Sequence, residues 1–258
     1  MTDDKKNLPA KSKGTAVTTT GKKSAFLEKV RAAKVSKAPA TTSAVKKADL
    51  MAAAVAGVAR PRLVFAFDAT ASREPAWDTA KTLTDAMFQA VPGQLDVALA
   101  VHGGSDVHTF TEFSSSAQTF RDRAAGIQCI AGQTRLIPII DKALTHSGIR
   151  AIVYTGDVYE ESLSEADRVA DACRIRGIRV FIFHDGPPEQ RPQAFQLLAD
   201  RSVGAVLPFD ADAPDRLRDL LSAIAVLATG GMRLLQEKRK ALPGAALLLS
   251  YMGDPKNE

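Results

Sequence analysis

Short apolar runs recur from residue 62 onward, and stretches with helical periodicity separate each run from the next. A continuous apolar run is typical of a strand that is covered on both faces. Strands are predicted at residues 63–69, 95–103, 151–156, 179–185 and 205–209. Helices are predicted at residues 73–91, 115–127, 136–146, 162–177 and 192–202, and from 214 onward with a break at Gly230-Gly231. This alternation predicts an α/β domain with a doubly wound, mostly parallel, Rossmann-like sheet and helices on both faces.

One strand departs from this pattern. Residues 108–113 (HTFTEF) alternate in polarity and follow the strand at 95–103 after a short turn at 103–106. Such a short connection makes the two strands antiparallel neighbours. We therefore expect one antiparallel edge strand.

Oxygen-bearing side chains follow two of the predicted strands, where ligands gather in open α/β sheets. Asp68, Thr70 and Ser72 alternate with alanines in FDATAS, so their side chains point in one direction. Thr134 lies in AGQTRL, and Asp157 ends the segment YTGD. Carboxylate and hydroxyl oxygens are ligands that Mg²⁺, Mn²⁺ and Ca²⁺ prefer. These residues predict a site for a hard divalent cation.

The same residues resemble the metal-ion-dependent adhesion site (MIDAS) of the von Willebrand factor A (VWA) family, which includes integrin I domains and many intracellular bacterial proteins. The resemblance covers roughly residues 61–228. The family's Asp-x-Ser-x-Ser loop corresponds to Asp68, Thr70 and Ser72, its loop threonine to Thr134, and its later aspartate to Asp157. Thr70 departs from the usual serine but keeps the hydroxyl. The resemblance implies that an acidic group of a partner protein completes the shell of a bound Mg²⁺.

Charged and aromatic residues beside these motifs would form a rim around the site and select partners. They are Arg73, Glu74, Tyr159, Glu160 and Glu161. A simpler interpretation stays open at this point, because loop charges are usually just solvated. Similarly, Asp68 or Ser72 could serve only as an N-cap of the helix at 73–91.

The positive charge of the chain is confined to its first part. Residues 1–62 contain 14 Lys and Arg against 4 Asp and Glu, whereas the remaining residues contain 20 against 25. We expect residues 1–60 to be a mostly disordered basic segment with short helices at 24–35 and 48–59. Such a segment is either a solubilising linker or an arm for nucleic acid, an acidic protein or anionic lipid. Residues 229–258 would extend the domain as a C-terminal helix and tail.

Composition and motifs argue against several classes of protein. The longest apolar stretch near the N-terminus, residues 50–59, is about half of the ~20 residues that a membrane span needs. No signal-peptide pattern is present, and the two cysteines, Cys129 and Cys173, lack metal-type spacing. We expect a cytoplasmic protein without a membrane span. Neither GxSxG nor GxxxxGK[ST] occurs in the sequence, which argues against an enzyme of those types.

Two questions remain open, one about the function of the site and one about the position of the C-terminal apolar segment. A Mg²⁺-dependent phosphohydrolase of the haloacid dehalogenase type would use Asp68 as nucleophile and Asp157 as metal ligand, but it needs an acid where this chain has Thr70. The apolar segment 241–252 either folds back onto the domain or is exposed for a partner. We expect a non-enzymatic interaction module, with the phosphohydrolase or a tail-driven tether as the alternative functions.

Overall fold

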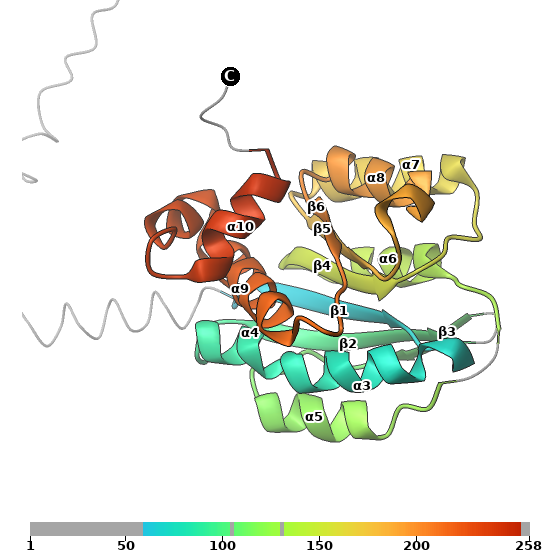
Figure 1. The fold of residues 1–258 in the computed structure, drawn as a ribbon, viewed down its shortest axis with the longest axis horizontal. Helices are drawn as coiled ribbons and strands as arrows, with labels where there is room; N and C mark the ends of the chain where they lie inside the picture. The colour runs from blue at the N-terminus through green and yellow to red at the C-terminus, as the bar shows by residue number, and fades with distance from the viewer. Residues whose placement is uncertain (1–58, 104–105, 130–131, 254–258) are drawn as a thin grey trace, which may run out of the picture. The chain divides into compact units, whose positions relative to one another are not determined.

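The computed structural model describes residues 59–103, 106–129 and 132–253, and these contain one six-stranded sheet with the order β3-β2-β1-β4-β5-β6 (Figure 1). The strands are β1 (Arg62–Asp68), β2 (Asp96–Gly103), β3 (Asp106–Phe110), β4 (Ile149–Gly156), β5 (Arg179–His184) and β6 (Ala205–Pro208). Only the β2–β3 pairing is antiparallel. The predicted α/β fold, with a mostly parallel sheet and an antiparallel edge strand, is confirmed.

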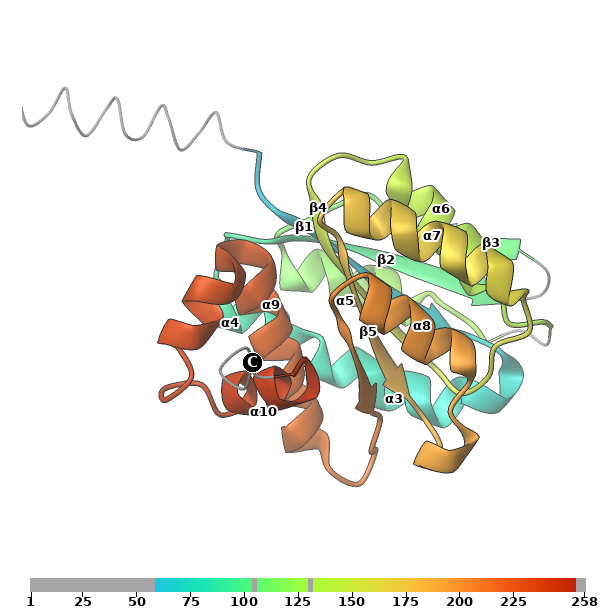
Figure 2. The ribbon, with the colours of Figure 1, turned by 90° about the horizontal axis from the view of Figure 1, so that it is seen from above.

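Helices cover both faces of the sheet (Figure 2). On one face lie the short helix η1 (Ala71–Arg73) and the helices α3 (Glu74–Leu83), α4 (Asp85–Ala90), α5 (Ala117–Ala125), α9 (Pro214–Glu237) and α10 (Pro243–Tyr251). On the other lie α6 (Leu136–Leu144), α7 (Leu163–Ile175) and α8 (Gln193–Arg201). A further short helix, η2 (Pro188–Gln190), follows β5.

Alternate side chains of β1 enter two separate hydrophobic cores. Leu63, Phe65 and Phe67 pack into the core beneath α3, α4 and α9. Val64 and Ala66 pack into the core beneath α6, α7 and α8. Because both faces are buried, residues 63–67 of the strand are all apolar, which accounts for the continuous run in the sequence.

The predicted helix at 73–91 is divided into η1, α3 and α4. The break lies at Thr84, which is fully buried and whose Oγ1 donates to the carbonyl oxygen of Lys81 at 2.9 Å. A threonine hydroxyl that bonds to the preceding turn competes with the helical backbone pattern. The hydrophobic periodicity of the sequence gives no indication of this local hydrogen bond, so it predicted one continuous helix.

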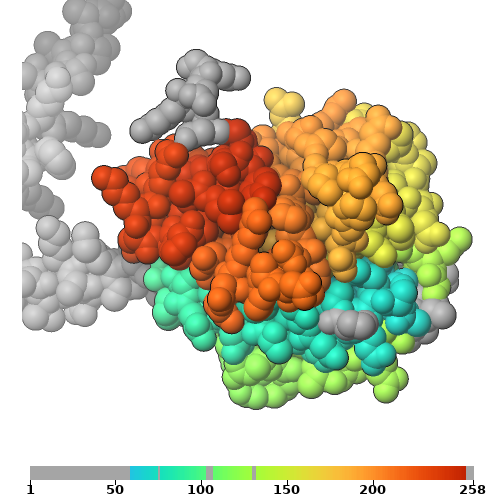
Figure 3. Space-filling model, viewed as in Figure 1, coloured from blue at the N-terminus to red at the C-terminus, as the bar shows by residue number. Residues whose placement is uncertain are grey.

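The C-terminal apolar segment folds back onto the domain (Figure 3). Ala245, Leu248 and Leu249 on α10 are buried in the core that α9 contributes to. A Cβ built on Gly244 would lie 1.9 Å from the carbonyl oxygen of Asp219, so the two helix backbones approach closely. This finding decides between the two interpretations of the segment for the residues that the structure describes.

The basic N-terminal segment (1–60) and its predicted helices at 24–35 and 48–59 lie outside the described residues, apart from Ala59 and Arg60. Within the described part of the chain, no helix is both long and apolar enough to cross a membrane.

The helices α7 and α8 end in the same hydrogen-bond motif with different residues. In α8 the N–H of Val203 donates to the carbonyl of Asp200 at 3.2 Å, and that of Gly204 donates to Ala199 at 2.8 Å. This Schellman motif needs a left-handed residue, which is Gly177 (φ 67°) after α7 but Val203 (φ 57°) after α8. A β-branched residue is strained in this conformation, by about 1–2 kcal/mol.

Replacing Val203 by glycine is therefore expected to stabilise the domain by about 0.5–1 kcal/mol. This is the relieved strain minus the cost of the conformational entropy that glycine adds to the unfolded chain. The Val203 side chain loses little burial because 53% of the residue is exposed. Urea unfolding measures the change, and Gly177→Val is the matched control, which should destabilise the domain. A free energy of unfolding that is lower for Val203→Gly than for the unmodified chain would contradict the inference that Val203 is strained.

Candidate metal centre

The predicted ligands meet where the order of the strands reverses. From β1 the chain first passes to β2 on one side, and it later returns to β4 on the other side of β1. Asp68 is the last residue of β1, and Asp157 directly follows β4, whose Thr155 pairs with Phe67. The two carboxylates therefore lie at neighbouring strand ends, at the switch point where open α/β sheets bind ligands.

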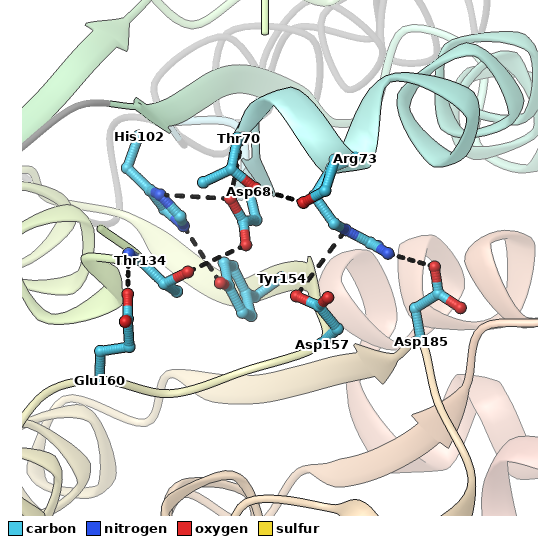
Figure 4. Close-up of polar contacts among 10 residues, drawn as sticks. Asp68, Thr70, Arg73, His102, Thr134, Tyr154, Asp157, Glu160 and Asp185 are labelled. Carbon is cyan, nitrogen blue, oxygen red and sulfur yellow. Dashed lines mark hydrogen bonds and ion pairs between the residues drawn. The ribbon is translucent and has the colours of Figure 1, made fainter. Parts of the chain in front are cut away.

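Asp68 organises the first part of this site (Figure 4). Its side chain is fully buried. One carboxylate oxygen accepts the N–H of Thr70 at 3.0 Å, and the other accepts the hydroxyl of Thr134 at 3.1 Å. The hydroxyls of Thr70 and Ser72 lie 3.4 Å apart. The structure thus brings together four of the five side chains that the sequence singled out.

Asp157 lies beside Tyr154 and faces Arg73 (Figure 4). Burial raises the pKa of the Tyr154 hydroxyl well above its ordinary value, and the carboxylates of Asp68 and Asp157 raise it further. Both carboxylates therefore act on the same buried hydroxyl. The side chain of Asp157 is 35% exposed, so it borders solvent, whereas Asp68 does not.

The capping interpretation fails for Ser72. Neither η1 nor α3 receives a side-chain cap at its N-terminus, and Ser72 is exposed. Asp68 does bond to a backbone N–H, but to that of Thr70 within the loop, not to an amide of α3. The hydroxyl of Ser72 is thus left to face solvent beside Thr70.

A buried histidine lies beneath the site. Nε2 of His102, on β2, lies 3.1 Å from the Tyr154 hydroxyl, and its Nδ1 lies 3.7 Å from an oxygen of Asp68. Burial lowers the pKa of His102, and the carboxylate of Asp68 opposes that shift. The adjacency of His102 to Asp68 follows from the β1–β2 register, which pairs the two residues.

Two of the predicted rim residues hold the loop that carries Thr134. Glu160 accepts the backbone N–H of Thr134 at 2.7 Å, and Glu161 accepts the N–H of Ile137 at 2.9 Å, at the start of α6. Burial raises the pKa of Glu161, while bonds from the α6 amides and the charge of Arg135 lower it. We refer to this pair of acids, Glu160 and Glu161, as the loop clamp.

The other predicted rim residues differ in exposure. Glu74 is exposed at the start of α3. Tyr159 is partly buried, its ring packs against Phe195, and its hydroxyl donates to the carbonyl of Ser162 at 2.9 Å. Burial also raises the pKa of Tyr159.

Arg73 is not a rim residue, because only 5% of it is exposed. The η1 turn directs its side chain inward, where it forms an ion pair with Asp185, the residue after β5 (Figure 4). Its Nε also lies 4.0 Å from an oxygen of Asp157. Asp185 was missed by sequence reasoning, although it follows a buried strand just as Asp68 and Asp157 do.

The donor set fits a hard divalent cation. In the part of the chain that the structure describes, no three His, Cys, Asp or Glu side chains group as metal ligands. The oxygens gathered at Asp68 are its own carboxylate and three hydroxyls, and Asp157 adds a second carboxylate at the neighbouring strand end. Mg²⁺, Mn²⁺ and Ca²⁺ accept such donors. A cation here would depend on threonine and serine oxygens to complete its shell.

No family model matches the sequence, and no curated protein matches it. Solved structures do match. A von Willebrand factor type A protein from Catenulispora acidiphila aligns with a TM-score of 0.53 and 13% identity, over 67% of this chain and 43% of that one. The VWA domain of SpRpn10 aligns with a TM-score of 0.50 and 14% identity, over 62% of this chain and 95% of that one.

A third structure is proximal thread matrix protein 1 from the mussel byssus, described with a zinc-occupied MIDAS motif. It aligns with a TM-score of 0.53 and 13% identity, over 64% of this chain and 46% of that one. This chain thus spans less than half of the Catenulispora and mussel proteins. At such identities the likeness concerns the fold, and we conclude that the described part of this chain has a VWA-like fold.

Proposed function

We propose that this domain is a metal-dependent protein-interaction module. In this proposal Mg²⁺, Mn²⁺ or Ca²⁺ is held by Asp68, Thr70, Ser72, Thr134 and Asp157. A carboxylate of a partner protein completes the shell. The observation that carries the proposal is the buried carboxylate of Asp68, which gathers the Thr70 loop and the Thr134 hydroxyl beside Asp157 at the switch point.

In this proposal Asp68 and Asp157 have different roles. Asp68 fixes the two hydroxyl-bearing loops, and Asp157 supplies negative charge at the solvent border. A bound divalent cation supplies an open coordination position that attracts an anionic oxygen. Thr70 stands where the phosphohydrolase alternative needs a second acid, so the site offers a hydroxyl in place of a general acid. This favours binding over phosphoryl transfer.

The test uses the full chain and the metal alone. Titration with Mn²⁺, followed by the electron paramagnetic resonance signal of the free ion, should show one bound equivalent. Mg²⁺ should raise the melting temperature, since a ligand that binds only the native state stabilises it, and EDTA should reverse the rise. If the chain binds no Mn²⁺ when the ion is present at millimolar concentration, the metal-dependent function is ruled out. Metal-dependent hydrolysis of an aryl phosphate would instead support the enzyme.

A further inference from the structure

A buried guanidinium lies beside the candidate metal centre. It has more N–H donors than its surroundings have hydrogen-bond acceptors for it. The side chain of Arg73 is only 6% exposed. One of its terminal nitrogens, Nη1, donates to Asp185. Its Nε and Nη2 have no hydrogen-bond partner among the described residues. Buried donors without acceptors are unfavourable, so Arg73 has a reason to move toward another acceptor.

The acceptor within reach is a proposed metal ligand. Nε of Arg73 lies 4.0 Å from an oxygen of Asp157, about 1 Å beyond the range of a direct hydrogen bond. A small rotation of the side chain would close this distance. An oxygen that accepts from a guanidinium is less available to a cation, and the positive charge of Arg73 would repel the cation as well. Arg73 would therefore compete with a bound cation for Asp157.

We infer that Asp185 is a positioning residue that holds Arg73 away from Asp157 and so sets the metal affinity of the site. This inference rests on the proposed function. Asp185 is fixed in place by its backbone N–H, which donates to the carbonyl of Gly156 at 3.1 Å, at the end of β4. Held there, Asp185 engages Nη1 of Arg73 and leaves its Nε 4.0 Å from Asp157.

The charges support this assignment. Asp68 and Asp157 together with Arg73 have a net charge of −1, and Asp185 brings the group to −2. A net charge of −2 balances a divalent cation. Without Asp185 the site would be both less negative and partly blocked by Arg73.

The test compares Mn²⁺ affinities of full-length variants by electron paramagnetic resonance. Asp185→Asn should weaken binding about tenfold, because Arg73 then pairs with Asp157; one tenfold step corresponds to about 1.4 kcal/mol. Arg73→Met should bind at least as tightly as the unmodified chain. The double variant Arg73→Met/Asp185→Asn should regain affinity to within about threefold. Glu189→Gln, which removes an exposed acid nearby on η2, is the charge control and should change little.

Melting temperatures in EDTA show whether each variant folds. Weak binding by Asp185→Asn that Arg73→Met does not rescue would overturn the inference, because Asp185 would then act directly or through the fold. Unchanged affinity in Asp185→Asn would overturn it too. These outcomes differ from the failure of the proposed function, in which the unmodified chain itself binds no Mn²⁺ and both proposals fall.

Discussion

Asp68→Asn is expected to remove metal binding and partner capture while the domain stays folded. The substitution keeps the shape of a fully buried side chain, and an amide can still accept the Thr70 N–H and donate to the Thr134 hydroxyl. It removes one negative charge from the site. A unit charge 4 Å from another is worth about 4 kcal/mol at an effective dielectric constant of about 20, so the affinity should fall at least a hundredfold.

Without metal the same substitution should leave the melting temperature unchanged or raise it, because a buried carboxylate is costly to desolvate. Mn²⁺ titration and thermal unfolding in EDTA measure the two effects separately. Asp171→Asn, an exposed acid on α7 that pairs with Arg201, should alter neither metal binding nor partner capture. Full retention of Mn²⁺ binding by Asp68→Asn would place the metal elsewhere.

Gly244→Ala is expected to separate α10 from α9. The added methyl group would lie 1.9 Å from the carbonyl oxygen of Asp219 and 2.3 Å from its carbonyl carbon, both backbone atoms that cannot rotate away. Overpacking commonly costs about 1–3 kcal/mol. Here the added methyl group would meet backbone atoms, which cannot move aside as a side chain can, so we expect a loss of about 3 kcal/mol or more. Leu248 and Leu249 would lose their burial.

Urea unfolding should show the loss of stability, and a dye that binds exposed apolar surface should report the freed helix. Ser250→Ala lies on the exposed side of the same helix and should change the stability by no more than about 0.5 kcal/mol. Equal stability of Gly244→Ala and the unmodified chain would mean that α10 does not pack tightly on α9.

The fold was predictable because burial on both faces leaves a direct signature in the sequence. The runs at 63–69, 151–156 and 179–185 each correspond to a central strand. Boundaries were less predictable, since they depend on single bonds. The edge strand was predicted at 108–113 but spans Asp106–Phe110. Thr111 and Ser114 still donate their backbone N–H groups to β2.

Asp68 and Asp157 could be placed at one edge of the sheet from the sequence because topology controls where the strands end. The surroundings of the site could not, because they depend on side-chain direction within loops. Arg73 looked like a solvent-exposed neighbour of Ser72, and nothing in a single turn of sequence shows that it points inward. Asp185 obeyed the rule that selected Asp68 and Asp157, an acid after a buried strand, and could have been found by applying that rule to β5.

The loop clamp has a mechanical consequence. Its two bonds run from one loop, after β4, to the Thr134 backbone and the first turn of α6. Hydrogen bonds to charged groups contribute about 1.5–3 kcal/mol each, so pulling these loops apart costs several kcal/mol. These bonds tie the loop that carries Asp157 to the Thr134 backbone and to α6, so a displacement of either segment would be resisted by the other.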